Sequence, residues 1–291
     1  MLSLLPTYEM SLNPPSAEPF DRYASRISKQ YSKMLADASL KEDDYQRFFE
    51  SNPCMLPGFN YGNPSHGAAF HAAVSQPAFD GPIRRRPDFM WLLETSLELI
   101  PVFIEIECPS KDMFRSSDNV QNAKFTQACE QIDEWRALLQ NHEAVERFYN
   151  RYAVSDRMRS MKFSPHYILV YGRRREYSID SFLTGKRAAK QTDDFEIISF
   201  DRLKPSYDAM RYGTVKVRPN GSVHTVAVPP TFQLGPSIAG YTSCWQDFDA
   251  AVDSMEAASE ERKAFLKTRY RYWCDWKSQS VNTVYETGKW E

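Results

Sequence analysis

The strongest constraint on the fold is an apolar run, Leu97–Glu107, that carries two carboxylates near its end, Glu105 and Glu107. Because side chains alternate between the two faces of a β-strand, the two glutamates would share one face while Ile104 and Ile106 point into the other layer. Carboxylates inside so apolar a strand are costly to bury unless a cation or hydrogen-bond donors compensate them. The run therefore predicts a sheet with a buried acidic site. The alternative is an edge strand whose glutamates face solvent.

A second strand is expected just upstream, at Arg86–Leu93, joined to the first by a tight connection near Glu94–Ser96. Compact apolar or alternating runs predict further strands at His166–Tyr171, Phe195–Phe200, Val215–Arg218 and Val223–Val228. An Asn-Gly turn joins the last two as a hairpin. Helical periodicity marks Asp21–Glu50 and the chain beyond Pro236. These elements predict an α/β fold, a mixed sheet flanked by helices, followed by a C-terminal hairpin and helices.

Composition narrows the class of protein. The 36 Lys and Arg residues against 38 Asp and Glu exclude a uniformly basic coat for nucleic acid but leave room for a local basic groove. Five cysteines without a CxxC pair predict reduced thiols and a cytoplasmic location. No apolar run approaches the roughly 18 residues of a membrane span, so no membrane partner is expected.

The 291 residues allow one large domain or two small ones. We expect an N-terminal leader and helix at 1–41, an α/β core at 42–205, and a hairpin and helical extension at 206–291 that packs on the core.

Asp88, in the upstream strand, would add another carboxylate beside Glu105. Mg²⁺ prefers one or two carboxylates together with waters and a phosphate oxygen, so a hard divalent cation is the natural compensation for these acids. Such a site can activate a water molecule and stabilise charge on a scissile phosphate.

A downstream helix is expected to open with a capping box at Asp118 and Gln121. Its apolar stripe consists of Phe125, Ala128, Ile132, Trp135 and Leu139. Beside it, Lys124, Gln127 and Gln131 recur at i, i+3 and i+7 and form a polar stripe. If this helix packs on the sheet, the polar stripe lies over the acidic strand. The alternative is an ordinary solvated helix face.

Six segments follow one another in a recognisable order: Tyr45–Pro53, Arg86–Phe89, Phe103–Ser110, Gln127–Trp135, Tyr167–Arg173 and Ile197–Leu203. Together they resemble the PD-(D/E)XK nuclease superfamily, and more narrowly the Shedu-type anti-phage nuclease domain (SduA-like C-terminal domain), over roughly residues 42–205. The resemblance implies a restriction-endonuclease-like core. It also implies Mg²⁺, or Mn²⁺ as an alternative, bound by Asp88, Glu105 and the backbone carbonyl of Ile106, with Gln131 supporting the site from the helix.

This chain departs from the family pattern at one position. The pattern expects Glu-x-Lys, whereas Glu105 is followed by Glu107, which would then ligate the metal or act as a base. Lys111, in the loop after the strand, or Lys124, on the helix, could restore the missing positive charge. The upstream acid that many such nucleases use has three adjacent candidates, of which the first fits best: Glu42, Asp43 and Asp44.

Two arginine clusters, Arg84–Arg86 and Arg173–Arg175, frame the expected acidic strands. The two clusters consist of Arg84, Arg85, Arg86, Arg173, Arg174 and Arg175. Contacts from Arg to phosphates carry no sequence information, so these clusters predict DNA binding without strong sequence specificity. Aromatic residues of the last helix, among them Tyr270, Trp273 and Trp276, would stack bases or, alternatively, belong to the core or a subunit interface.

The sequence therefore predicts a Mg²⁺-dependent deoxyribonuclease that acts in cytoplasmic anti-phage defence, the defence role resting on the resemblance alone. The alternative is a non-cleaving DNA-binding or oligomer-assembly module of the same fold, because Glu107 replaces the lysine. A homo-oligomer is expected in either case.

Overall fold

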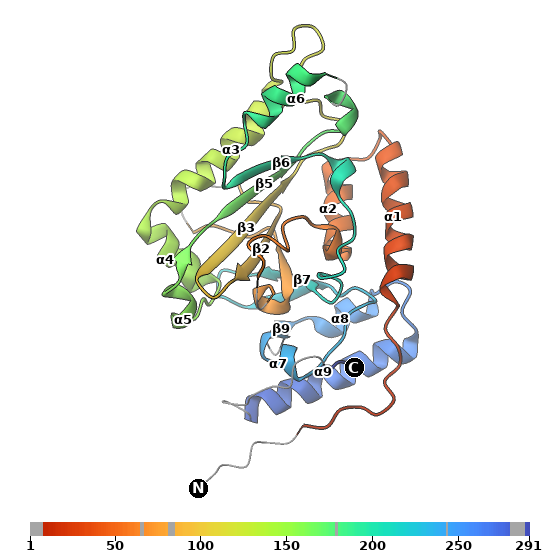
Figure 1. Ribbon diagram of the computed structural model, residues 1–291. Helices are drawn as coiled ribbons and strands as arrows, with labels where there is room; N and C mark the ends of the chain where they lie inside the picture. The colour runs from red at the N-terminus through yellow and green to blue at the C-terminus, as the bar shows by residue number, and fades with distance from the viewer. Residues whose placement is uncertain (1–7, 65–66, 81–84, 178–179, 243, 280–288) are drawn as a thin grey trace.

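The computed structural model describes residues 8–64, 67–80, 85–177, 180–242, 244–279 and 289–291. Within these residues one mixed sheet of nine strands is covered by helices (Figure 1). The strands are β1 (Ala72–Ser75), β2 (Phe89–Glu94), β3 (Glu98–Ile106), β4 (Lys162–Phe163), β5 (His166–Val170), β6 (Phe195–Ile198), β7 (Gly213–Val217), β8 (Val223–Ala227) and β9 (Trp245–Gln246). The α-helices are α1 (Phe20–Ala36), α2 (Glu42–Ser51), α3 (Ala123–Leu139), α4 (His142–Arg151), α5 (Asp156–Arg159), α6 (Ser181–Ala188), α7 (Pro236–Thr242), α8 (Phe248–Asp253) and α9 (Glu260–Gln279). Single 3₁₀ turns lie at Pro53–Met55, Ala69–His71, Arg174–Glu176 and Phe200–Arg202.

The acidic strand β3 lies inside the sheet. The strand order is β6-β5-β3-β2-β1-β7-β8-β9, with β4 beside the start of β3. Because β3 is antiparallel to β2 and parallel to β5, the beginning of β2 and the ends of β3 and β5 meet at one edge of the sheet. The α/β fold with a mixed sheet flanked by helices, expected from the sequence, is confirmed.

Both faces of the sheet are buried, which explains why β2 and β3 are apolar almost throughout. On one face Phe103 shares a hydrophobic cluster with Trp135 and the rest of the apolar stripe of α3. On the other face Ile104 and Ile106 share a second cluster with residues of α1 and α2, such as Phe49. The alternation expected along the acidic strand is therefore correct, and the solvent-facing edge strand is not observed.

The expected start of the third helix is wrong. A capping box at Asp118 and Gln121 does not form, because the segment before the helix folds back on itself: Gln121 pairs with Phe114 in an isolated β-bridge. Asp118 instead lies 2.8 Å from the guanidinium of Arg115. α3 begins at Ala123, with Asn122 as its N-cap.

The strands that follow residue 206, β7, β8 and β9, extend the sheet. β7 pairs in parallel with β1, and the expected hairpin places β8 antiparallel to β7, with Gly221 in its turn at φ +80°. The division of the chain into three domains stays a prediction.

Three aromatic residues of α9 are part of the core, as the alternative interpretation held. Tyr270, Trp273 and Trp276 are buried, so they present no free surface on which bases could stack. Arg262 of the same helix is also buried and donates a hydrogen bond to the carbonyl oxygen of Phe232 at 2.9 Å. Among the described helices, none is long and apolar enough to cross a membrane.

Candidate active site

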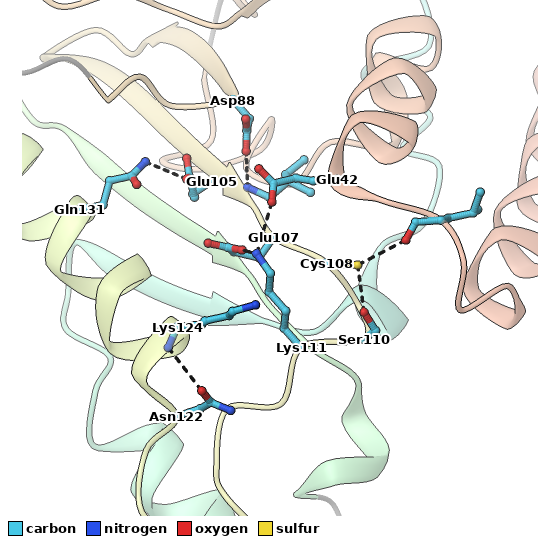
Figure 2. A network of polar contacts seen from close by, with 12 residues as sticks. Glu42, Asp88, Glu105, Glu107, Cys108, Ser110, Lys111, Asn122, Lys124 and Gln131 are labelled. Carbon is cyan, nitrogen blue, oxygen red and sulfur yellow. Dashed lines mark hydrogen bonds and ion pairs between the residues drawn. The ribbon is translucent and has the colours of Figure 1, made fainter.

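Asp88 and Glu105 face each other across two adjacent strands. Phe89 pairs with Ile104, and continuing this antiparallel register by one residue sets Asp88 opposite Glu105. Both side chains therefore point to the face that α3 covers. The backbone N–H of Ile106 donates a hydrogen bond to Oδ2 of Asp88 at 2.7 Å, which fixes this carboxylate against the end of β3 (Figure 2).

Glu105 has one satisfied carboxylate oxygen and one that is not. Gln131, from α3, donates a hydrogen bond from Nε2 to Oε1 of Glu105 at 2.7 Å. The other oxygen, Oε2, is buried and has no hydrogen-bond partner among the described residues. A buried carboxylate oxygen without a partner is costly, and a cation removes that cost. The donor set thus fits a hard divalent ion.

The pKa values of Asp88 and Glu105 are both higher than is usual for these side chains. Burial, reinforced by the neighbouring carboxylates of Glu42 and Glu107, raises the pKa of Asp88 to about 8, although the Ile106 N–H and Lys111 act in the opposite direction. Burial also raises the pKa of Glu105 well above its usual value, reinforced by Asp88. Four carboxylates therefore repel one another around the end of β3.

Lys111 places a positive charge beside these acids. Its ammonium group forms an ion pair with Glu107 and lies 3.3 Å from Oε2 of Glu42, the first residue of α2 (Figure 2). Burial by itself would lower the pKa of Lys111, but the two glutamates raise it above its ordinary value. Lys111 thus stays charged. Of the three acids at the start of α2, Asp44 is used elsewhere, because it caps the helix by accepting from the N–H of Lys41 at 2.9 Å.

Two of the three polar residues expected on α3 face solvent. Lys124 and Gln127 are exposed. The backbone N–H of Lys124 donates a hydrogen bond to Oδ1 of Asn122, the N-cap of α3. Of the polar stripe, Gln131 is the residue that contacts an acid. Within the part of the chain that the structure describes, no three His, Cys, Asp or Glu side chains are arranged as a metal-holding group. An ion here would depend on two carboxylates and a backbone oxygen.

The two arginine clusters lie on either side of the acidic pair. Arg85 and Arg86 are exposed just before β2, and Arg173–Arg175 follow β5, so β3 runs between them. Arg84 lies outside the described residues. Arg173 is held by Asp201 at 2.7 Å and donates to the carbonyl oxygen of Leu35 at 2.8 Å, whereas Arg174 and Arg175 are exposed.

A surface cavity of about 790 Å³ adjoins the second cluster, between α1 and the chain that follows β5 and β6. Its lining includes Arg173 and Arg175, together with Tyr31 and Lys204, which sequence reasoning did not single out. No spacing in the sequence could have found them, because tertiary packing alone brings α1 beside this loop.

The fold and the site together define a class: an α/β protein with a nuclease-like core, in which the central strands of a mixed sheet present acidic side chains at one edge. The sequence model described as "Shedu protein SduA, C-terminal" matches residues 39–203, more than half of the chain, and the chain belongs to this family. The resemblance drawn from the sequence is therefore confirmed. Comparison with curated proteins and with solved structures gives no significant match.

Proposed function

We propose that the protein is a metal-dependent DNA nuclease that hydrolyses phosphodiester bonds in anti-phage defence. The observation that carries this proposal is the unpartnered, buried Oε2 of Glu105 beside Asp88, in a cluster of carboxylates that repel one another. A divalent cation compensates such a cluster, and its absence leaves the arrangement unfavourable. Membership of the Shedu family, which is associated with defence, supports the biological role.

Asp88 and Glu105 would hold Mg²⁺ or Mn²⁺ together with the backbone carbonyl of Ile106. When bound, the ion would polarise the scissile phosphate and lower the pKa of a water molecule. Two neighbours of the acids orient them: the N–H of Ile106 holds Asp88, and the amide of Gln131 holds Glu105. Groups of this kind fix the direction of a ligand's lone pairs and tune its basicity.

DNA would approach between the arginine clusters. Arg85 and Arg86 on one side and Arg174 and Arg175 on the other are exposed and available to phosphate oxygens. Such contacts position the duplex without reading its sequence. We therefore propose DNA as the substrate, without strong sequence specificity.

One observation favours a second candidate function. Lys111 is paired with two glutamates, so the site carries little free positive charge for a phosphate. The second candidate is a DNA-binding or assembly module of the same fold that does not cleave DNA. A homo-oligomer is proposed for this candidate as well.

The deciding experiment is a cleavage assay on supercoiled and linear DNA with Mg²⁺, with Mn²⁺ and with EDTA. We expect cleavage with either metal and none in EDTA. Asp88→Asn keeps an oxygen to accept from Ile106 but loses the charge, and we expect its rate to fall on the order of 10²-fold or more. Asp118→Asn, an exposed acid outside the site, is the matched control. Wild-type protein that binds DNA but cuts under none of these conditions contradicts the nuclease and favours the second candidate.

A further inference from the structure

Position 107 holds an acid where the family pattern has a lysine, and the structure brings a lysine to that acid from another place in the chain. The ammonium group of Lys111 contacts the carboxylates of both Glu107 and Glu42 (Figure 2). Its charge also acts on Asp88. A cation therefore lies among the acidic side chains, although it comes from the loop after β3 instead of from the strand.

The loop that carries Lys111 is firmly held. The N–H of Lys111 donates to the carbonyl oxygen of Cys108 at 3.0 Å, which closes a turn. The thiol of Cys108 in turn lies 3.7 Å from the carbonyl oxygen of Leu40, just before α2. On the other side the carbonyl oxygen of Lys111 packs against Gly172, where a Cβ atom would come within 2.9 Å of it and φ is +60°. The backbone at position 111 is thus fixed from two directions.

The side chain of Lys111 is fixed as well. It is only a quarter exposed, and its two partners come from different elements, Glu107 from the end of β3 and Glu42 from the start of α2. An exposed ion pair would be worth little and would hold no geometry. A lysine that forms ion pairs with two acids from different elements, by contrast, keeps its ammonium group in one position. Lys124 has no such support, since its side chain is exposed on the first turn of α3.

We propose that Lys111 is the catalytic lysine of this chain, and that Glu107 and Glu42 are positioning residues that hold its ammonium group at the acidic pair. This inference rests on the proposed nuclease function. In the hydrolysis, the water oxygen forms a bond to phosphorus while the bond from phosphorus to the leaving oxygen breaks. The water gives up one proton to solvent and the leaving oxygen takes one from solvent. Lys111 stays protonated throughout and stabilises the negative charge that builds up on the phosphate oxygens.

The competing interpretation is a structural ion pair that only ties the loop to α2. The two interpretations differ in what a lysine at position 107 would do. If Lys111 is a catalytic cation, Glu107→Lys in the Lys111→Met background returns an ammonium group to the position that the family pattern uses. If Lys111 is only structural, that double variant has lost both ion pairs and gains nothing.

The test compares single-turnover cleavage rates with Mg²⁺ against DNA affinity in EDTA and thermal stability. We expect Lys111→Met to cut on the order of 10²-fold more slowly, with DNA affinity close to wild type and a lower melting temperature, because Glu107 and Glu42 lose their cation. We expect Glu107→Lys in the Lys111→Met background to recover at least tenfold of that loss. Lys162→Met, which removes an exposed lysine paired with Glu98 at the other end of β3, is the matched control and keeps the wild-type rate.

Three results overturn the proposal: a Lys111→Met rate near wild type, no recovery in the double variant, or loss of cleavage on Lys124→Met instead. A failure of the nuclease function is recognised separately, because wild-type protein then does not cut and Asp88→Asn makes no difference. If wild type cuts and Asp88→Asn does not, the variants of Lys111 test this inference alone.

Discussion

Glu105 combines burial with an incomplete set of hydrogen bonds, which is unusual for a charged side chain in a folded core. Only 8% of it is exposed, Gln131 satisfies one oxygen, and the other has no partner among the described residues. This residue and Asp88 were predictable, because strand alternation and pairing set them together. Whether Lys111 or Lys124 joins them was not, because that depends on the path of the loop after β3, for which side-chain periodicity gives no signal.

We expect Glu105→Gln to stabilise the metal-free protein. The substitution keeps an oxygen for Gln131 but removes an acid whose charged form is disfavoured by burial and by Asp88 and Glu107, so the free energy of unfolding at pH 8 in EDTA should rise by about 1–3 kcal/mol. Mg²⁺ at the proposed site should raise the melting temperature of the wild type, and the variant should lose this increase. Urea denaturation in EDTA measures the first effect, and thermal denaturation with and without Mg²⁺ measures the second. Glu98→Gln, at the other end of β3, should change stability by no more than about 0.5 kcal/mol. A destabilised Glu105→Gln protein in EDTA would contradict the argument.

His71 is a basic group that burial keeps neutral. Burial lowers its pKa to about 3, and its ring stacks on Tyr212 with centroids 4.2 Å apart. Because the unfolded chain titrates near pH 6.5, it binds more protons than the folded protein below that value, so stability falls as the pH drops from about 6.5 toward 3. We expect His71→Phe to remove up to about 1.4 kcal/mol per pH unit from that slope, measured as the free energy of unfolding between pH 4 and 7. An unchanged slope would show that His71 does not remain neutral.

For single elements, patterns that recur along many residues predicted the strands and α3 correctly, whereas the four-residue capping motif predicted the wrong start for α3. Alternation and turn residues located β2, β3 and the β7–β8 hairpin, and the apolar stripe located α3. The capping box at Asp118 was wrong, because Gln121 pairs with Phe114 in a β-bridge and Asp118 pairs with Arg115. Asn122, which does cap α3, is followed by no acidic partner and so gave a weaker signal.

The cap can be tested by a pair of substitutions. We expect Asn122→Ala to lower the free energy of unfolding by about 1 kcal/mol, because the N–H of Lys124 loses its acceptor. Asp118→Ala should cost no more than about 0.5 kcal/mol, since its ion pair with Arg115 is exposed. Urea denaturation of both variants ranks the two residues. The reverse ranking would mean that the capping box expected from the sequence is the one that stabilises the helix.

The whole molecule depends on pairings that no local pattern encodes. β1 lies between β2 and β7, two strands from distant parts of the chain, and β7 joins it in parallel. Six strands, β2, β3, β5, β6, β7 and β8, could be placed along the sequence, whereas β1, β4 and β9 were not located. The order of the strands in space could not be predicted, because parallel pairing leaves no turn between partners. The same packing decides which basic residues share a surface: the clusters before β2 and after β5 become neighbours of one acidic site only because β3 lies between them.

That arrangement predicts how DNA binding depends on salt. Each exposed arginine that contacts a phosphate releases counterions, so Arg174→Ala with Arg175→Ala should lower the slope of log affinity against log salt by about 2. Arg85→Ala with Arg86→Ala should do the same from the other side of β3. Both double variants should lose affinity equally for unrelated sequences, because phosphate contacts do not read bases.

Lys267→Ala with Arg271→Ala on α9 removes two cations from the C-terminal extension and should leave the slope as in wild type. Fluorescence anisotropy in EDTA across a range of salt concentrations gives all four slopes. If only the variant of α9 changes its slope, DNA does not bind across the acidic edge of the sheet, and the nuclease proposal loses its substrate path.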